Sequence, residues 1–87
     1  MGRSVMYKNK SEWGNNLCGK NVALIRKKRV PRTSQRALAE MLQLQGVDLD
    51  KNAIQRIESG ERFVTDIELV ALAKVLDVKM EELVKNV

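Results

Sequence analysis

The stretch SQRALAEMLQLQGVDLDKNAIQRIESG, residues 34–60, contains two helical patterns separated by a glycine. In the first pattern, Leu38, Met41 and Leu42 recur at the spacing that places side chains on one face of a helix. The second pattern has the same property, and its apolar residues are Ala53, Ile54 and Ile57. The spacing predicts two short amphipathic helices, one after the other.

Each of these helices has a residue suited to begin it and a glycine suited to end it. Ser34 and Asp50 stand before the two patterns, and their side-chain oxygens can accept hydrogen bonds from the unpaired N–H groups that begin a helix. Gly46 and Gly60 follow the patterns, and glycine adopts the left-handed conformation that ends a helix without steric cost. Two bounded helices with a brief connection make this stretch a candidate helix-turn-helix.

The polar residues of the second helix lie off its apolar stripe, in the first turns. Lys and Arg side chains suit the N7 and O6 atoms of guanine, whereas Asn and Gln suit N6 and N7 of adenine. An ordinary solvated helix face is the alternative interpretation of the same pattern. The candidate base-reading residues are Lys51, Asn52, Gln55 and Arg56.

Three linked runs carry a family resemblance: SQRALAEM at 34–41, AIQRIESGERF at 53–63 and IELVALAKVLDV at 67–78. In this order they resemble the Cro/C1-type helix-turn-helix family, also called lambda repressor-like or XRE, over residues 19–84. The resemblance implies an all-α, compact domain of five helices in which helices 2 and 3 form the helix-turn-helix. It also implies a sequence-specific transcriptional regulator, expected to act as a repressor and to bind a dyad operator in double-stranded DNA as a homodimer.

The same resemblance implies roles for individual residues. Gln35 would bond a DNA phosphate and brace the reading helix, although a solvated first helical residue is the alternative. Glu58 would be structural and pair with a cation of helix 1, and Arg29 is the matching position. Arg62 would touch the DNA backbone or lie free on the surface. The residues implied to face bases or nearby backbone are Lys51, Asn52, Gln55 and Arg56.

Between Leu38 and Ile54 the chain departs from the family pattern by an insertion of five residues, since sixteen positions separate these residues and the usual pattern has eleven. We expect three of the added residues to extend the first helix through Leu44 and Gln45, and two to lengthen the connection at 47–49. The connection carries Asp48, an acid close to where phosphates would lie. The entry angle of the second helix into a groove depends on this insertion.

Composition and charge favour one small helical domain with a polyanionic partner. The chain has 87 residues and three aromatic ones, so its core must come from aliphatic side chains. Residues 1–36 hold ten Lys/Arg and one acid, a net +9, whereas residues 37–87 hold six and ten, a net −4. A basic segment beside the motif suits DNA phosphates. A membrane-surface role would need an apolar face that RKKRVPR lacks.

Residues 1–16 are mainly polar, and we expect a flexible N-terminal arm there, followed by the domain at 17–87. Trp13 would pack on helix 1, or the basic arm would follow the DNA backbone. Helix 1 is predicted over residues 17–28, with Val22 and Ile25 facing inward, and Pro31 ends it.

The C-terminal part is expected to complete the bundle. Thr65 and Glu68 have the spacing of a capping box that opens helix 4. Phe63 is interpreted as a core residue. A short helix 5 at 79–85 would place the apolar residues Met80, Leu83, Val84 and Val87 on one side, where they close the core or form a dimer interface.

Several function classes lack their usual residues. The sequence has no histidine and a single cysteine, so we expect no enzyme, no cofactor and no metal site. Neither a membrane span nor a signal peptide is evident, and a cytoplasmic protein is expected. Two alternatives stay open: an antitoxin that binds both its operator and a toxin, and a protein-interaction module that no longer reads DNA.

Overall fold

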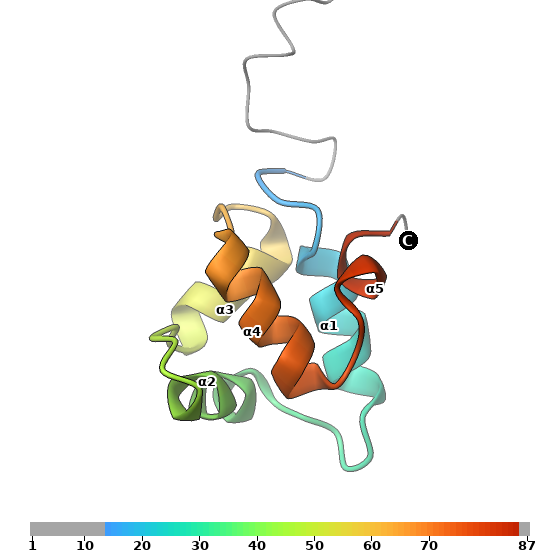
Figure 1. Cartoon of the computed structure of the whole chain (residues 1–87), viewed down its shortest axis with the longest axis vertical. Coiled ribbons are helices and arrows are strands. Elements are labelled where there is room, and N and C mark those ends of the chain that lie inside the picture. The colour runs from blue at the N-terminus through green and yellow to red at the C-terminus, as the bar shows by residue number, and fades with distance from the viewer. Residues whose placement is uncertain (1–13, 86–87) are drawn as a thin grey trace, which may run out of the picture.

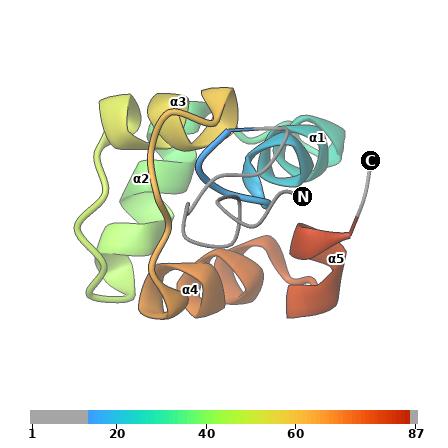
Figure 2. The same ribbon diagram turned by 90° about the horizontal axis from the view of Figure 1, so that it is seen from above.

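The computed structural model describes residues 14–85, in which every regular element is a helix (Figure 1). Seen from above, α3 and α1 lie along one side of the molecule, α4 and α5 lie along the other, and α2 closes one end (Figure 2). The all-α, five-helix prediction is confirmed. The helices are α1 (Gly19–Lys28), α2 (Gln35–Leu44), α3 (Lys51–Ser59), α4 (Asp66–Leu76) and α5 (Met80–Val84).

The predicted helix boundaries are confirmed at the helix-turn-helix. The Ser34 hydroxyl accepts a hydrogen bond from the Ala37 N–H at 3.0 Å, and Asp50 Oδ1 accepts one from the Ala53 N–H at 2.8 Å. Gly60 ends α3 in the left-handed conformation, with φ 86°. The ends of α2 and α3 are therefore determined by local chemistry.

The start of α4 follows the predicted capping box. The Glu68 N–H donates to the Thr65 hydroxyl at 3.1 Å, and Glu68 Oε1 accepts from the Thr65 N–H at 3.0 Å. Two of the N–H groups at this helix start are thereby satisfied reciprocally.

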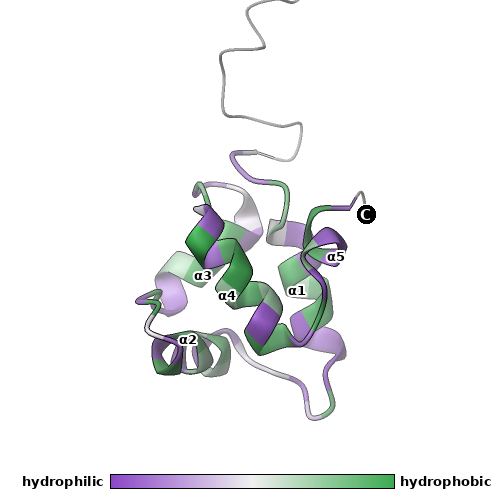
Figure 3. Ribbon diagram, viewed as in Figure 1, coloured by the Kyte–Doolittle hydropathy of each residue, from purple (hydrophilic) through white to green (hydrophobic). Residues whose placement is uncertain are grey.

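The core is assembled from all five helices. Each contributes at least one apolar side chain with almost no solvent exposure, and burying such a side chain stabilises the fold by about 1.5–3 kcal/mol. Apolar residues also continue on the outward side of α4, where Ile67 and Val70 are exposed (Figure 3). The most deeply buried core residues are Val22, Leu38, Leu42, Leu49, Ile54, Ile57, Leu72 and Leu83.

The inserted residues between α2 and α3 are packed rather than loosely looped. Helix α2 extends through Leu44, as predicted, but Gln45 caps the helix and is not part of it. The Val47 N–H donates to the Leu42 carbonyl at 3.0 Å, and Leu49, only 1% exposed, is inserted into the core. The burial of Leu49 was not expected from the sequence, and it anchors the connection next to the start of α3.

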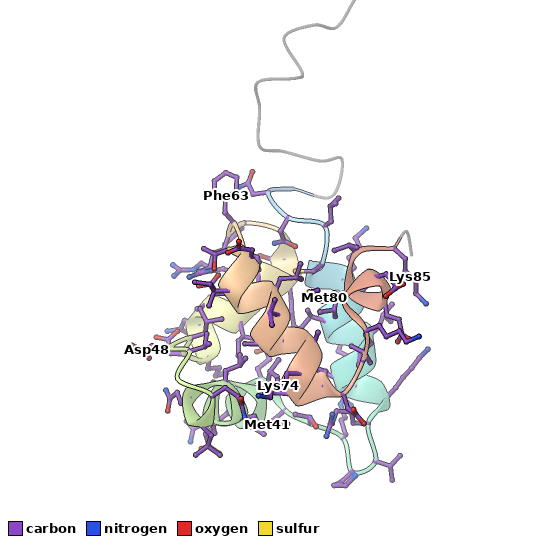
Figure 4. The ribbon with its side chains drawn as sticks, viewed as in Figure 1. Met41, Asp48, Phe63, Lys74, Met80 and Lys85 are labelled. Carbon is purple, nitrogen blue, oxygen red and sulfur yellow. The ribbon has the colours of Figure 1, made fainter. Side chains whose placement is uncertain are left out.

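Phe63 corrects one expectation, because its side chain is 54% exposed rather than part of the core. It projects from the loop between α3 and α4 (Figure 4). Its neighbour Val64 packs against the core instead. Adjacent side chains of an extended segment point in opposite directions, so only one of the two can face inward.

The N-terminal boundary also differs in part from the expectation of an arm over residues 1–16. Residues 1–13, including Trp13, lie outside the described residues. Asn15 and Asn16, in contrast, donate hydrogen bonds to carbonyls of residues 57–62 and therefore belong to the folded domain. Helix α1 starts two residues later than predicted, because the Asn16 side chain accepts the Gly19 N–H at 2.7 Å.

The short helix α5 is held by one core side chain and one amide. Leu83 is fully buried, and Asn21 Nδ2 of α1 donates to the Leu83 and Lys85 carbonyls at 2.8 Å each. Met80 and Val84 stay 47% and 38% exposed. In the part of the chain that the structure describes, no helix is both long enough and apolar enough to cross a membrane.

Cys18 is a buried core residue, and its environment predicts an unreactive thiol. Burial raises its pKa to about 11 from 9.0. A shift of two units leaves roughly 100-fold less thiolate at a given pH below both values. A thiol-specific chromogenic reagent at about pH 8 should modify the folded protein at least roughly 100-fold more slowly than the urea-unfolded protein. Equal rates in the two states would show that this thiol is accessible.

Candidate nucleic-acid interface

Helix α3 has one buried face and one exposed face, as the sequence pattern predicts. Ala53, Ile54 and Ile57 are buried against the core. The opposite face carries donors and acceptors of the kinds that hydrogen-bond to base edges. Its exposed side chains include Lys51, Asn52, Gln55 and Arg56.

A buried ion pair connects α3 to α1. Arg26 Nε lies 2.7 Å from Glu58 Oε2, and Arg26 Nη2 donates to Glu58 Oε1 at 2.9 Å. The two side chains are only 7% and 10% exposed. Arg26 Nη1 also donates to the Thr33 carbonyl at 3.1 Å, just before α2. This two-pronged geometry orients α3 relative to α1 and to the start of α2.

The predicted pairing of Glu58 with Arg29 is wrong. Arg29 is the residue that caps the C-terminal end of α1. It donates instead to the Val75 carbonyl of α4 at 3.2 Å. Arg26 lies four residues after the fully buried Val22, on the inward face, and this spacing is the sequence signal that indicates the correct partner. Glu58 therefore pairs with a cation of α1, as expected, but the cation is Arg26. Its structural role stays a prediction.

Gln35 completes the network at the start of α2. Its Nε2 donates to Glu58 Oε1 at 2.9 Å. This hydrogen bond joins the first residue of α2 to α3 through Glu58. A second N–H of the same amide is available by its chemistry for another acceptor. The contact of Gln35 with a phosphate stays a prediction.

The surroundings of the α2 N-terminus are strongly basic. Unpaired backbone N–H groups and the positive end of the helix dipole favour an anion at this position. Four exposed cations lie near it in sequence, at the end of α1, in the loop after it and in the first turn of α2. Long-range attraction of a polyanion needs such a cluster. They are Lys27, Lys28, Arg32 and Arg36.

Arg62, predicted to touch the DNA backbone, is engaged within the protein. Its Nη1 and Nη2 donate to the Glu68 carboxylate at 2.8 and 3.1 Å, and Nη1 also donates to the Phe63 carbonyl at 2.8 Å. The hydrogen bond with Glu68 raises the pKa of Arg62, and Arg62 in turn lowers the pKa of Glu68. This geometry links the loop after α3 to α4. If Arg62 contacted a DNA phosphate, its guanidinium would have to bind the phosphate and Glu68 at the same time.

The Glu68 pair predicts a pH-dependent contribution to stability. Because its folded-state pKa is lowered from the ordinary value of 4.5, the carboxylate stabilises the fold above that pH, and this stability is lost as the pH falls through the folded-state pKa. The difference in thermal unfolding midpoint between the wild type and Glu68→Gln should therefore be largest near neutral pH and shrink below about pH 4. A difference that stays constant from neutral to acid pH would contradict this assignment.

Within residues 14–85, no cluster of three or more His, Cys, Asp or Glu side chains is arranged to hold a metal ion. A cavity between the start of α1 and the end of α3 has a volume of about 30 Å³, which suits a single water molecule.

The comparisons with known proteins agree with this geometry. The family model described as Helix-turn-helix, of the Cro/C1 type, matches residues 25–83. The chain therefore belongs to the Cro/C1-type helix-turn-helix family, whose domains bind DNA and regulate transcription. Comparisons with curated proteins and with solved structures found no match.

Proposed function

We propose that this protein is a sequence-specific transcriptional regulator that reads base pairs with α3. The observation that carries the proposal is the exposed polar face of α3, from Lys51 to Arg56. The helix is held in place by the contacts of Glu58 with Arg26 and Gln35. A reading helix must present its side chains at a defined angle, and a buried bidentate ion pair provides that definition.

In the proposed complex, α2 contacts the phosphate backbone and α3 reads the bases. The N-terminus of α2 faces the phosphate backbone, with Gln35, Arg32 and Arg36 as the nearest donors, and this contact positions the protein without reading sequence. Helix α3 enters the major groove. Direct readout comes from its exposed side chains, which are Lys51, Asn52, Gln55 and Arg56.

We further propose that the protein binds its operator as a homodimer and represses by occluding a promoter. The exposed apolar residues Leu17, Met80 and Val84 on and beside α1 and α5 support this assignment, because a second copy would cover them. A two-fold dimer would present two copies of α3 to a dyad. Sedimentation equilibrium should show concentration-dependent association, and a protein that stays monomeric both alone and on its operator would remove the dimer from the proposal.

The experiment that tests the function is selection of bound sequences from a randomised duplex library. The enriched duplex and a scrambled duplex of equal composition are then titrated over a range of salt concentrations. Enrichment of a dyad that binds more tightly than its scrambled control is the expected result. Binding that depends on salt but not on sequence would reduce the activity to electrostatic attachment, and no binding at all would favour the protein-interaction alternative.

A further inference from the structure

Two consecutive asparagines before α1 bind the C-terminal end of the proposed reading helix. Asn16 Nδ2 donates to the Ile57 carbonyl at 3.0 Å and to the Arg62 carbonyl at 2.8 Å. Its Oδ1 accepts the Gly19 N–H. One side-chain amide thereby joins the start of α1, the last turn of α3 and the loop that follows.

Asn15 adds two bonds to the same loop. Its backbone N–H donates to the Gly60 carbonyl at 2.7 Å, and its Nδ2 donates to the Glu61 carbonyl at 2.9 Å. With those of Asn16, four carbonyls between residues 57 and 62 accept hydrogen bonds from this two-residue segment. Ile57 lies in the last turn of α3, and its carbonyl also accepts the Gly60 N–H. Residues 60–62 follow the helix, so the donors of Asn15 and Asn16 join both the helix end and the loop after it to the segment before α1.

The segment before α1 and the end of α3 are in close backbone contact at two glycines. A Cβ atom at Gly19 would collide with the Ile57 carbonyl, and one at Gly14, whose φ is +109°, would collide with the Gly60 carbonyl. Glycine at these two positions allows the close contact, and the hydrogen bonds of Asn15 and Asn16 stabilise it. The segment is visible between the end of α3 and the start of α1 (Figures 1 and 2).

The fastened end of α3 lies next to a predicted base-reading residue. The Arg56 carbonyl accepts the N–H groups of Glu61 and Arg62 at 2.9 and 3.2 Å. The turn that ends α3 therefore begins at Arg56, and Asn16 donates hydrogen bonds to carbonyls of this same turn. The Arg26–Glu58 ion pair fixes α3 from α1, and Asn16 fixes its end. Both attachments hold the last turn of α3, because Ile57 and Glu58 are adjacent residues in that turn.

We propose that Asn16 is a positioning residue for DNA recognition: acting through the Ile57 and Arg62 carbonyls, it sets the orientation of α3 and thereby the discrimination between operator and other sequences. This inference rests on the proposed function, since it concerns the same reading helix. It predicts a loss of selectivity rather than a general loss of DNA affinity, because phosphate contacts tolerate small displacements and bidentate base contacts do not.

The test compares Asn16→Ala, which removes all three contacts, with Asn16→Ser, whose hydroxyl can accept from Gly19 and donate to one carbonyl. The readout is the ratio of affinities for the enriched duplex and its scrambled control, measured below the unfolding midpoint of every variant. Asn16→Ala should lower this ratio about tenfold with little change in affinity for the scrambled duplex. Asn16→Ser should have a ratio between those of Asn16→Ala and the wild type. If the alanine variant does not fold, the serine variant is compared with the wild type instead.

Val75→Ala provides the matched control, since it removes two methyl groups from a half-buried residue of α4 that packs on the core. It lowers stability without contacting the end of α3, and its affinity ratio should equal that of the wild type. An unchanged ratio in Asn16→Ala, or an equal fall in Val75→Ala, would overturn the inference while leaving the proposed function intact. A wild type that binds both duplexes equally would overturn the proposed function itself, before any variant is compared.

Discussion

Arg26→Met is expected to lower the free energy of unfolding by about 3–5 kcal/mol, because it leaves the carboxylate of Glu58 buried without its charge partner. Glu58 is 10% exposed and would keep only the Gln35 amide as a hydrogen-bond donor among its present side-chain partners. The Thr33 carbonyl would lose a donor as well. Methionine retains much of the arginine stem, so the loss reports the charge and its hydrogen bonds rather than a cavity. Urea denaturation measures it.

Arg29→Met is the matched control three residues away. Within residues 14–85, the Arg29 guanidinium makes one hydrogen bond, to the Val75 carbonyl, and forms no ion pair, so its loss should cost only about 1 kcal/mol. Equal losses in the two variants would contradict the assignment of Arg26 as the partner of Glu58. A larger loss in Arg29→Met would favour the pairing that the family resemblance implied.

Arg56→Ala is expected to weaken binding to the selected operator by about 1–3 kcal/mol, roughly 5- to 150-fold, and to relax the base preference at one position of each half-site. The side chain is exposed on α3, so the free energy of unfolding should change little. Affinity for the scrambled duplex should fall only by the small electrostatic contribution of one positive charge. Titration of operator variants substituted at each position measures this effect.

Lys74→Ala controls for that lost charge. Lys74 is exposed on α4, which lies on the opposite side of the molecule from α3 (Figures 2 and 4). Its removal should leave the base preference unchanged. If Arg56→Ala retained wild-type selectivity at every operator position, Arg56 would be a surface residue and base reading would have to come from other side chains of α3.

The helix boundaries could be predicted from the sequence because their causes are local. Ser34, Asp50, Gly60 and the Thr65–Glu68 box each act within three or four residues of their own position. Helical spacing likewise predicted the buried and exposed faces of α2 and α3. Local patterns of this kind contain the information that a helix end or a helix face needs.

The parts that could not be predicted depend on contacts between distant segments. Helical spacing places Arg26 on the inward face of α1, but only the packing of α1 on α3 shows that it meets Glu58. Asn16 was assigned to the arm, because nothing near it in sequence indicates that it binds carbonyls 41 and 46 residues away. Phe63 was misjudged, and the burial of Leu49 was not predicted, for a similar reason: a connection has no periodicity that tells which side chain faces the core.

The central claim is that α3, together with the N-terminus of α2, forms the DNA-binding surface. Amide chemical shifts recorded while the isotope-labelled protein is titrated with its enriched duplex test this claim most directly. The predicted result is that the largest changes fall at residues 34–37 and 51–56, with small changes on α4 and α5. Changes concentrated instead on the exposed side of α4 around Ile67 and Val70 would contradict it and would place the DNA-binding surface on the other side of the molecule.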